Sequence, residues 1–288
     1  MTSTVAIINW NSGRLLRPCI ESLLATTTIS EILVIDNASE DDSIESVQGF
    51  RSRVDFVQNS VNRGFAAAVN QAFQVTSSTY VLILNPDVRA MPGAVQQLED
   101  FMDAHPRVAA VGGHVGDKYL PKALPTIGAL VRENLGLGGG PHGPSRGRGG
   151  RPHVQGPPKP VEQPAAAALM IRRDAFDAVG GFDEQFYPAW YEDVDFCRRV
   201  KTQGWDIYFA PQAEFLHEGG YSAEAMGSQN FLRSYYGNQL RYVRKHFGAL
   251  GTAVVRASIA AGMIERMIVK PRHAGAYGKA FIGALKGW

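Results

Sequence analysis

Two groups of carboxylates in this sequence have residue types and surroundings that suit group-transfer chemistry. In the first group, Asp87 stands in the corner Asn85-Pro86-Asp87, directly after the apolar run 81–84. Such a run is typical of a strand buried on both faces, and Pro86 must end it because proline has no N–H. A carboxylate held rigidly there can bind a divalent cation against a diphosphate. An ordinary turn that closes a strand explains this stretch equally well when it is taken alone.

The second group is a run of acids that follows aromatic residues. Glu192, Asp193 and Asp195 begin a predicted helix, where the helix dipole tolerates negative charge. The aromatic residues around them are Phe186, Tyr187, Trp190 and Tyr191. Aromatic walls suit a sugar ring and exclude water, which raises the proton affinity of a carboxylate and makes it a usable base near neutral pH. A charged helix start beside ordinary core aromatics is the alternative.

The first 111 residues alternate between apolar strands and helices, which would position the first group. The sequence predicts strands at 4–8, 32–35, 54–57, 81–84 and 108–111, and helices at 12–24, from 42, at 64–75 and at 92–104. This alternation predicts a parallel sheet with helices on both faces. Polar clusters follow three strands: Asn9-Trp10-Asn11, Asp36-Asn37 and Asn85-Pro86-Asp87. They would line a cleft at the carboxyl edge of the sheet, although Asn and Asp are also common turn formers.

Residues 117–163 interrupt this alternation and are rich in Gly and Pro, with four basic residues and no acid between Asn134 and Val161. We expect a flexible loop here, either simply solvated or acting as a lid that meets phosphates. Beyond it the sequence predicts strands at 165–172, 205–209 and 213–216, a helix turn at 174–179 and helix from 223. The last of these strands ends at His217, which could join Asp87 as a metal ligand.

Composition limits the class of protein. The chain has 288 residues, 45% of them hydrophobic, and a net charge of +2, so it is an ordinary globular protein with no overall nucleic-acid footprint. Cys19 and Cys197 have neither disulfide nor metal spacing, and we expect both in the core. Because no signal-peptide pattern and no apolar run of about 18 residues is found, we expect no spanning helix and a cytoplasmic location.

The end of the chain is basic. From Arg241 onwards it has nine Lys or Arg residues and one acid, Glu265, interleaved with apolar residues. This pattern is typical of an amphipathic helix on an anionic membrane surface. A helix that packs on the domain with a solvated basic face is the alternative.

Gly64 opens a predicted helix whose next residues, 66–68, are all Ala. Small residues at a helix N-terminus allow close approach of an anion. The chain lacks the Gly-x4-Gly-Lys pattern of a P-loop, and no Gly-x-Gly-x-x-Gly follows its first strand. A P-loop and a dinucleotide-type Rossmann domain are therefore disfavoured.

Taken in order, the motifs resemble those of family 2 glycosyltransferases with the GT-A fold, and more closely the rhamnosyltransferase-like bacterial branch. The matching motifs are Ile-Ile-Asn-Trp-Asn-Ser at 7–12, Val-Ile-Asp-Asn-Ala-Ser at 34–39, Asn62-Arg63-Gly64-Phe65-Ala66 with Asn70, Leu84-Asn85-Pro86-Asp87, Gly180-Gly181-Phe182-Asp183 followed by Tyr191-Glu192-Asp193-Val194-Asp195, and His217. The resemblance covers roughly residues 4–245.

The resemblance implies an α/β fold with a mostly parallel central sheet flanked by helices and a C-terminal helical extension. A glycosyltransferase domain at 1–245 would hold a Rossmann-like nucleotide-binding half at 1–113, the flexible loop at 117–163 and an acceptor half at 164–245. Residues 246–288 would form the basic helical tail.

The resemblance also implies residue roles. Asp36 would contact the nucleotide base, helped by Asn9 and Asn11, and Asn62 and Gly64 would border the diphosphate. Asp87 would be the main ligand of Mg2+ or Mn2+ with His217 as the second, and Asn85 replaces the first acid of the family's Asp-x-Asp signature. Asp193 would be the catalytic base, and Trp190 and Glu192 would bind substrate.

The function implied is inverting, metal-dependent transfer of a sugar from a nucleotide-diphosphate donor to a hydroxyl of a glycan or lipid-linked glycan, in cell-envelope polysaccharide synthesis. The branch indicates dTDP-rhamnose as donor, with UDP- and GDP-sugars open, and a cytoplasmic or peripheral inner-membrane location. Adjacent Glu192 and Asp193 are poor candidates for the flanking pair of a hydrolase. A non-catalytic sugar-nucleotide-binding subunit is the alternative, against which intact Asp87, Asp193 and His217 argue. A sugar-nucleotide nucleotidyltransferase on a related fold is a third possibility. Such an enzyme would need a Gly- and Lys-rich loop after the first strand, and Asn9–Arg14 does not supply one.

Overall fold

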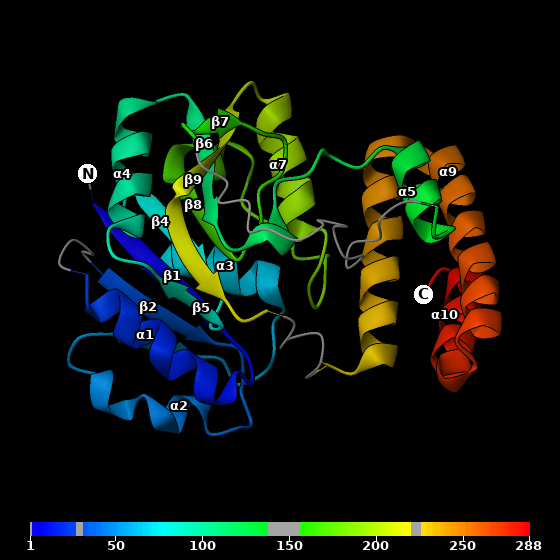
Figure 1. Ribbon diagram of the computed structural model, residues 1–288, viewed down its shortest axis with the longest axis horizontal. Coiled ribbons are helices and arrows are strands. Elements are labelled where there is room, and N and C mark those ends of the chain that lie inside the picture. Colours follow the sequence, from blue (N-terminus) through cyan, green and yellow to red (C-terminus); the bar gives the residue numbers. More distant parts are fainter. Residues whose placement is uncertain (1, 27–30, 138–155, 220–225) are drawn as a thin grey trace. The chain divides into compact units, whose positions relative to one another are not determined.

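The computed structural model describes residues 2–26, 31–137, 156–219 and 226–288. The chain groups into two compact units (Figure 1). The first unit consists of residues 1–124, 151–188 and 192–222, and the second of residues 125–150, 189–191 and 223–288. The predicted division at residues 113, 163 and 245 concerns which substrate each part binds, and it stays a prediction.

The N-terminal half of the sheet in the first unit is parallel, as predicted. β1 (Ser3–Asn9), β2 (Glu31–Asp36), β3 (Asp55–Gln58) and β4 (Tyr80–Leu84) pair in the order β3-β2-β1-β4. Every residue of β4 is buried, because helices cover both faces of the sheet. Asn9, Asp36 and Asn85 therefore come to the same carboxyl edge.

Alternate residues of β1 face two separate hydrophobic clusters. Val5 and Ile7 pack with α1 (Leu16–Leu24), α2 (Ser43–Ser46) and α4 (Ala94–Ala104), whereas Ala6 and Ile8 pack with α3 (Phe65–Val75), α6 (Arg173–Ala178) and α7 (Glu192–Thr202). Short 3-10 turns at Gly13–Leu15 and Gln48–Phe50 adjoin α1 and α2. Cys19 and Cys197 are buried in these clusters, as predicted for core residues.

The rest of the sheet mixes strand directions. β8 (Ala168–Arg172) runs antiparallel between β4 and β6 (Val108–His114), and β9 (Asp206–His217) lies parallel to β6. β5 (Val88–Ala90) and β7 (Lys159–Pro160) pair antiparallel with β9. The expectation of separate strands at 205–209 and 213–216 is wrong, because β9 is continuous. Pro211 interrupts the apolar pattern, but the register with β6 is irregular between Gly113 and His114, so no ladder N–H is required of it.

The expectation of a structureless insert over 117–163 is also wrong in part. It contains a 3-10 turn (Asp117–Tyr119), α5 (Ile127–Asn134) and β7. Thr126 caps α5, since its side chain accepts a hydrogen bond from the Ala129 N–H at 3.2 Å. The Gly- and Pro-rich composition of the whole stretch obscured this local signal. Arg146, Arg148 and Arg151 lie outside the described residues.

The second unit is helical, which confirms the predicted C-terminal extension. It contains α5, α9 (Ser228–Val269), a 3-10 turn (Pro271–His273) and α10 (Ala274–Lys286). Gly248, with φ 71° and ψ −166°, breaks α9 into two helical segments. Contrary to the sequence expectation, α9 is long and apolar enough to cross a membrane by length and composition. However, 39% of its apolar window is buried, and core helices pass the same test.

Candidate active site

The ends of β1 and β2 are joined by buried polar side chains. Asn9 and Asp36 are register neighbours, and the Asn9 Nδ2 donates to the Asp36 Oδ1 at 2.8 Å. The Ser39 hydroxyl donates to the same oxygen at 2.6 Å, and the Ser39 N–H lies 3.3 Å from the other. Asp36 is 3% exposed, so its carboxylate is held by the protein and its predicted contact with the nucleotide base stays a prediction.

Asn11 links the loops after these two strands. Its N–H donates to the Ser39 hydroxyl at 2.8 Å, and its side-chain oxygen accepts from the Glu40 N–H at 2.7 Å. Asn11 adopts a left-handed conformation, with φ 46°, which Asn tolerates better than most residues. The loop at 9–12 is therefore fixed to the loop at 36–40.

Asn62 and Gly64 form a tight turn at the start of α3. The Asn62 side-chain oxygen accepts from the Gly64 N–H at 2.8 Å. Asn37 braces this turn, because its Oδ1 accepts from the Arg63 N–H and its Nδ2 donates to the Gly64 carbonyl, both at 3.0 Å. Sequence reasoning placed Asn37 in a polar cluster but gave it no role.

Gly64 lies where a side chain does not fit. It has φ +85°, and an added Cβ would lie 2.9 Å from the Tyr187 Cδ2 and 3.1 Å from the Pro188 carbonyl oxygen. We expect Gly64→Ala to lower the free energy of unfolding by about 1–3 kcal/mol. Urea denaturation measures this effect. Gly49→Ala is the matched control, since nothing lies within 4 Å of that position, and equal losses for both variants would contradict the close approach.

Asp87 and His217 come together at the carboxyl edge. Val88 at the start of β5 pairs with His217 at the end of β9, so Asp87 lies beside the imidazole. The His217 Nε2 is 3.2 Å from the Asp87 Oδ1, and the two side chains are only 6% and 7% exposed. The Tyr119 ring covers His217, with centroids 4.5 Å apart.

This pair fits a divalent cation. The buried His217 Nδ1 has no hydrogen-bond partner in the part of the chain that the structure describes. Carboxylate and imidazole are both suitable ligands for Mn2+. Across the described ranges no group of three or more His, Cys, Asp or Glu gathers as a metal site. Two protein ligands would leave the remaining positions to donor phosphate oxygens and water, which is how Mg2+ is commonly held.

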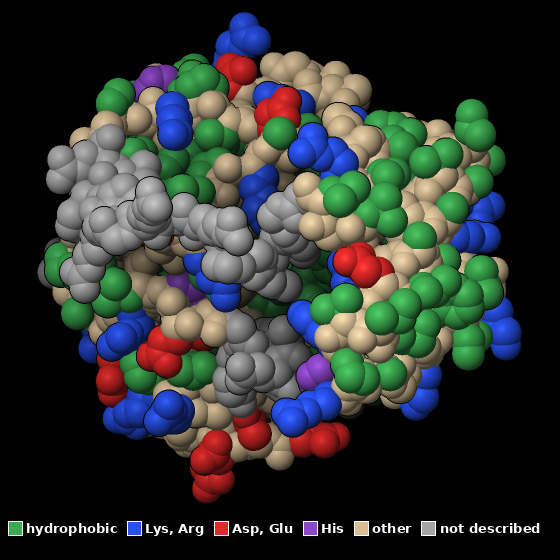
Figure 2. All heavy atoms as spheres, turned by 45° about the vertical axis from the view of Figure 1, so that its right-hand side comes forward, with side chains coloured by type: hydrophobic (Ala, Val, Ile, Leu, Met, Phe, Trp, Pro, Cys, Tyr) green, Lys and Arg blue, Asp and Glu red, His purple; other side chains and the backbone are tan. Residues whose placement is uncertain are grey.

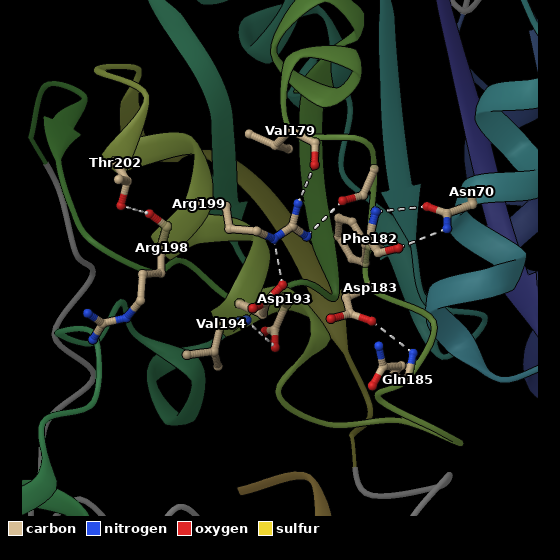
Figure 3. A network of polar contacts seen from close by, with 12 residues as sticks. Asn70, Val179, Phe182, Asp183, Gln185, Asp193, Val194, Arg198, Arg199 and Thr202 are labelled. Carbon is tan, nitrogen blue, oxygen red and sulfur yellow. Dashed lines mark hydrogen bonds and ion pairs between the residues drawn. The ribbon is translucent and has the colours of Figure 1, made fainter. Parts of the chain in front are cut away.

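The three acids at the start of α7 have different environments, and Figure 3 draws the contacts of Asp193 with Val194 and of Arg199 with Val179. Asp195 is fully buried and accepts from the Arg199 Nε at 2.6 Å, while the other Arg199 nitrogens donate to the carbonyls of Val179 and Gly181, each at 2.7 Å. Arg199 thus fastens α7 to the turn before it, and Asp195 holds the guanidinium in place. Asp193 accepts from the Val194 N–H at 2.8 Å, also drawn in Figure 3, and from the Gln163 Nε2 at 3.3 Å.

Burial raises the pKa of Glu192 well above its usual value, and the negative charge of Asp193 adds to the shift. Burial also raises the pKa of Asp193, but the Val194 N–H, the Gln163 amide and the Lys122 charge oppose that shift. The Glu192 Oε2 has no hydrogen-bond partner within the described residues. Of the two, Asp193 is therefore the carboxyl whose charged form has hydrogen-bond donors to stabilise it.

Replacing Glu192 with Gln tests whether the pKa of Glu192 is raised in the folded protein. The folded protein binds the Glu192 proton more tightly than the unfolded chain does. As the pH rises above 4.5, the ordinary pKa of Glu, the unfolded chain loses this proton first, so the free energy of unfolding falls. We expect Glu192→Gln to have a higher Tm than the wild type at neutral pH, with the difference shrinking toward pH 4.5. Thermal unfolding across this pH range measures it, with exposed Glu45→Gln as the control. A difference independent of pH would contradict the shift.

Asp87 and Asp193 lie near the same edge of the sheet. The Asn85 N–H, next to the Asp87 corner, donates to the Ala167 carbonyl at 3.0 Å. Gln163, which contacts Asp193, is four residues before Ala167. Four residues span at most about 14 Å, so the backbone at Gln163 lies within that distance of the Asn85 contact with Ala167. Sequence reasoning missed Gln163, because it stands in the Gly- and Pro-rich stretch without a recognisable motif.

Trp190 belongs to the second unit. It adopts φ 76°, and its ring packs edge-on against Phe231 with centroids 4.9 Å apart. Its predicted role in substrate binding stays a prediction.

Comparison with known proteins identifies the class. Residues 4–180 match the sequence model of Glycosyl transferase family 2, and residues 154–218 match that of the N-terminal domain of galactosyltransferase. The chain belongs to the family 2 glycosyltransferases and is an enzyme of that class. Within the family it is similar to N-acetylglucosaminyl-diphospho-decaprenol L-rhamnosyltransferase of Mycobacterium tuberculosis, with 30% identity over 237 residues that cover 76% of each chain.

A further relative and two solved structures are also glycosyltransferases. The pre-mycofactocin glycosyltransferase of M. tuberculosis is 27% identical over 221 residues, covering 75% of this chain and 42% of that one. Among solved structures, the mannosyltransferase PcManGT from Pyrobaculum calidifontis, in complex with GDP-Man and Mn2+, gives a TM-score of 0.59 at 13% identity, covering 99% of this chain and 86% of that one. GalNAc-T7 with UDP, GalNAc and Mn2+ gives 0.58 at 14% identity, with 99% and 56% covered. The predicted GT-A fold is confirmed.

Proposed function

We propose that this enzyme is an inverting, metal-dependent glycosyltransferase that moves a sugar from a nucleotide-diphosphate donor to a hydroxyl of a lipid-linked glycan. The observation that carries the proposal is the nearly buried pair Asp87 and His217, 3.2 Å apart at the carboxyl edge of the sheet. Asp87 and His217 would hold a divalent cation, which when bound would supply Lewis-acid stabilisation of the charge on the departing diphosphate. Mg2+ and Mn2+ both suit this pair, and two structural neighbours were solved with Mn2+.

Asp193 is proposed as the catalytic base. It accepts the proton of the acceptor hydroxyl, whose oxygen forms the new bond to the anomeric carbon. The bond from that carbon to the diphosphate breaks, and its electron pair leaves with the diphosphate. Asp193 has hydrogen-bond donors that stabilise its charged form, whereas the Glu192 Oε2 has none within the described residues, so Asp193 is proposed as the one base of the site. One base opposite the leaving group gives inversion of the anomeric configuration.

Donor and acceptor are proposed from the relative's chemistry. The similar M. tuberculosis enzyme is named for L-rhamnosyl transfer to N-acetylglucosaminyl-diphospho-decaprenol. We propose dTDP-rhamnose as donor and a glycan on a polyprenyl diphosphate as acceptor, in cell-envelope polysaccharide synthesis at the cytoplasmic face of the membrane. Asn9, Asn11, Asp36, Asn62, Gly64 and Asn85 are proposed to bind the donor.

A donor screen tests this proposal. A ligand that binds only the folded state raises Tm by mass action. We expect dTDP-rhamnose with Mn2+ to raise Tm more than UDP- or GDP-sugars and to release dTDP when a lipid-linked acceptor is added. A larger shift with another sugar nucleotide would reject this donor. Binding without nucleoside diphosphate release for any acceptor would favour a non-catalytic subunit.

A further inference from the structure

The second helical segment of α9 carries a solvent-exposed apolar stripe. Its residues recur at intervals of three and four, which places them on one helix face: Leu250, Val254, Ala257, Ala261, Ile264 and Ile268. Leu250 is 80% exposed and Ile268 is 76% exposed. At 1.5 Å per residue the stripe is about 27 Å long. A row of this length that finds no partner among the described residues is uncommon on a soluble protein surface.

The other face of the same segment is packed inside the helical unit. Val255, Ile259 and Met263 are fully buried, and α10 and α5 both pack against α9. Because one face is committed to protein, only the other face can meet lipid. This arrangement suits a helix that lies in the membrane interface rather than one that crosses the bilayer.

Charge favours an anionic partner. Lys270 and Arg272 follow the stripe and are exposed, as are Lys279 and Lys286 on α10. Glu265 is the one acid between Arg241 and the end of the chain, against nine basic residues. Figure 2 shows hydrophobic side chains gathered on the right of the view, with Lys and Arg along the right-hand edge. Apolar residues beside positive charge match the interface of an anionic bilayer.

We propose that the apolar stripe and these four basic residues form a docking surface for an anionic phospholipid bilayer. The inference builds on the proposed lipid-linked acceptor, since docking would bring the enzyme to the membrane that holds it. Its test measures vesicle binding rather than transfer, so docking can fail while the transferase assignment stands.

The test is flotation of the full chain with vesicles of phosphatidylcholine, with and without phosphatidylglycerol. We expect binding to the anionic vesicles and a loss of at least about tenfold in affinity for the triple variant Leu250→Glu, Ile264→Glu, Ile268→Glu. Lys270→Gln and Arg272→Gln should each weaken binding by about fivefold. Val75→Glu, at a 51% exposed apolar site on α3, is the matched control and should bind like the wild type.

Two outcomes would overturn the docking surface. One is equal vesicle binding by the wild type and the triple variant. The other is a dimer that the triple variant abolishes, with no binding of the wild type to either vesicle, which would assign the stripe to a second copy of the chain.

Discussion

Asp193→Asn is expected to lower kcat by about 10²- to 10⁴-fold, the range that general-base catalysis contributes. Asn has nearly the same shape as Asp but cannot accept the proton of the acceptor hydroxyl. The buried position raises the pKa of Asp193, so removing its charge should not lower stability at neutral pH. Steady-state transfer kinetics with a thermal-unfolding check measure both effects.

Asp174→Asn, an exposed acid on α6 in the same unit, is the control for the loss of one negative charge and should keep wild-type kcat. Asp195→Asn separates an effect on stability from an effect on the chemical step. It breaks a buried ion pair with Arg199 and should cost about 3 kcal/mol of stability rather than the chemical step. Full activity of Asp193→Asn with an unchanged Tm would remove Asp193 from the mechanism.

Asp87→Ala and His217→Ala are expected to have the second large effect. Lewis-acid stabilisation by a bound cation is worth several kcal/mol, so loss of the main ligand should lower kcat/KM by about 10³-fold. His217→Ala should require higher Mn2+ concentrations for half-maximal rate, because the carboxylate remains. Kinetics at increasing Mn2+ concentration and calorimetry of Mn2+ with the nucleoside diphosphate test both expectations.

Arg89→Ala is the matched control for this site. Arg89 lies on β5, two residues from Asp87, but its side chain is 46% exposed and points to Glu218, 3.9 Å away. It should bind Mn2+ like the wild type. Wild-type Mn2+ affinity in Asp87→Ala would contradict the assigned site, whatever the effect of that variant on activity.

The parallel part of the fold and the placement of Asn9, Asp36 and Asp87 at one edge of the sheet could be predicted from local patterns. Each strand is a short apolar run that ends in a polar corner, and parallel pairing brings these corners to one edge. Local patterns could not predict the pairing of Asp87 with His217, because the two residues are 130 positions apart and meet through the pairing of β5 with β9. No periodic pattern encodes that meeting, and the resemblance to a family supplied it.

The residues that sequence reasoning missed share a physical feature. Gln163 and Asn37 each act through a side-chain amide on a distant segment, and an amide carries no periodic signal. Likewise, residue type and spacing do not separate the three acids at 192–195, and only the resemblance to a family gave Glu192 and Asp193 separate roles. The tertiary contacts distinguish them physically, because Arg199 pairs with Asp195 while Gln163 contacts Asp193.

A structure of the enzyme with Mn2+, an intact donor analogue and an acceptor tests the central claim most directly. The account predicts that the ion contacts Asp87, His217 and the donor diphosphate. It also predicts that the Asp193 carboxylate lies on the opposite face of the sugar ring, within hydrogen-bond reach of the acceptor hydroxyl. An ion bound elsewhere, or an Asp193 carboxylate on the diphosphate side of the anomeric carbon, would contradict it.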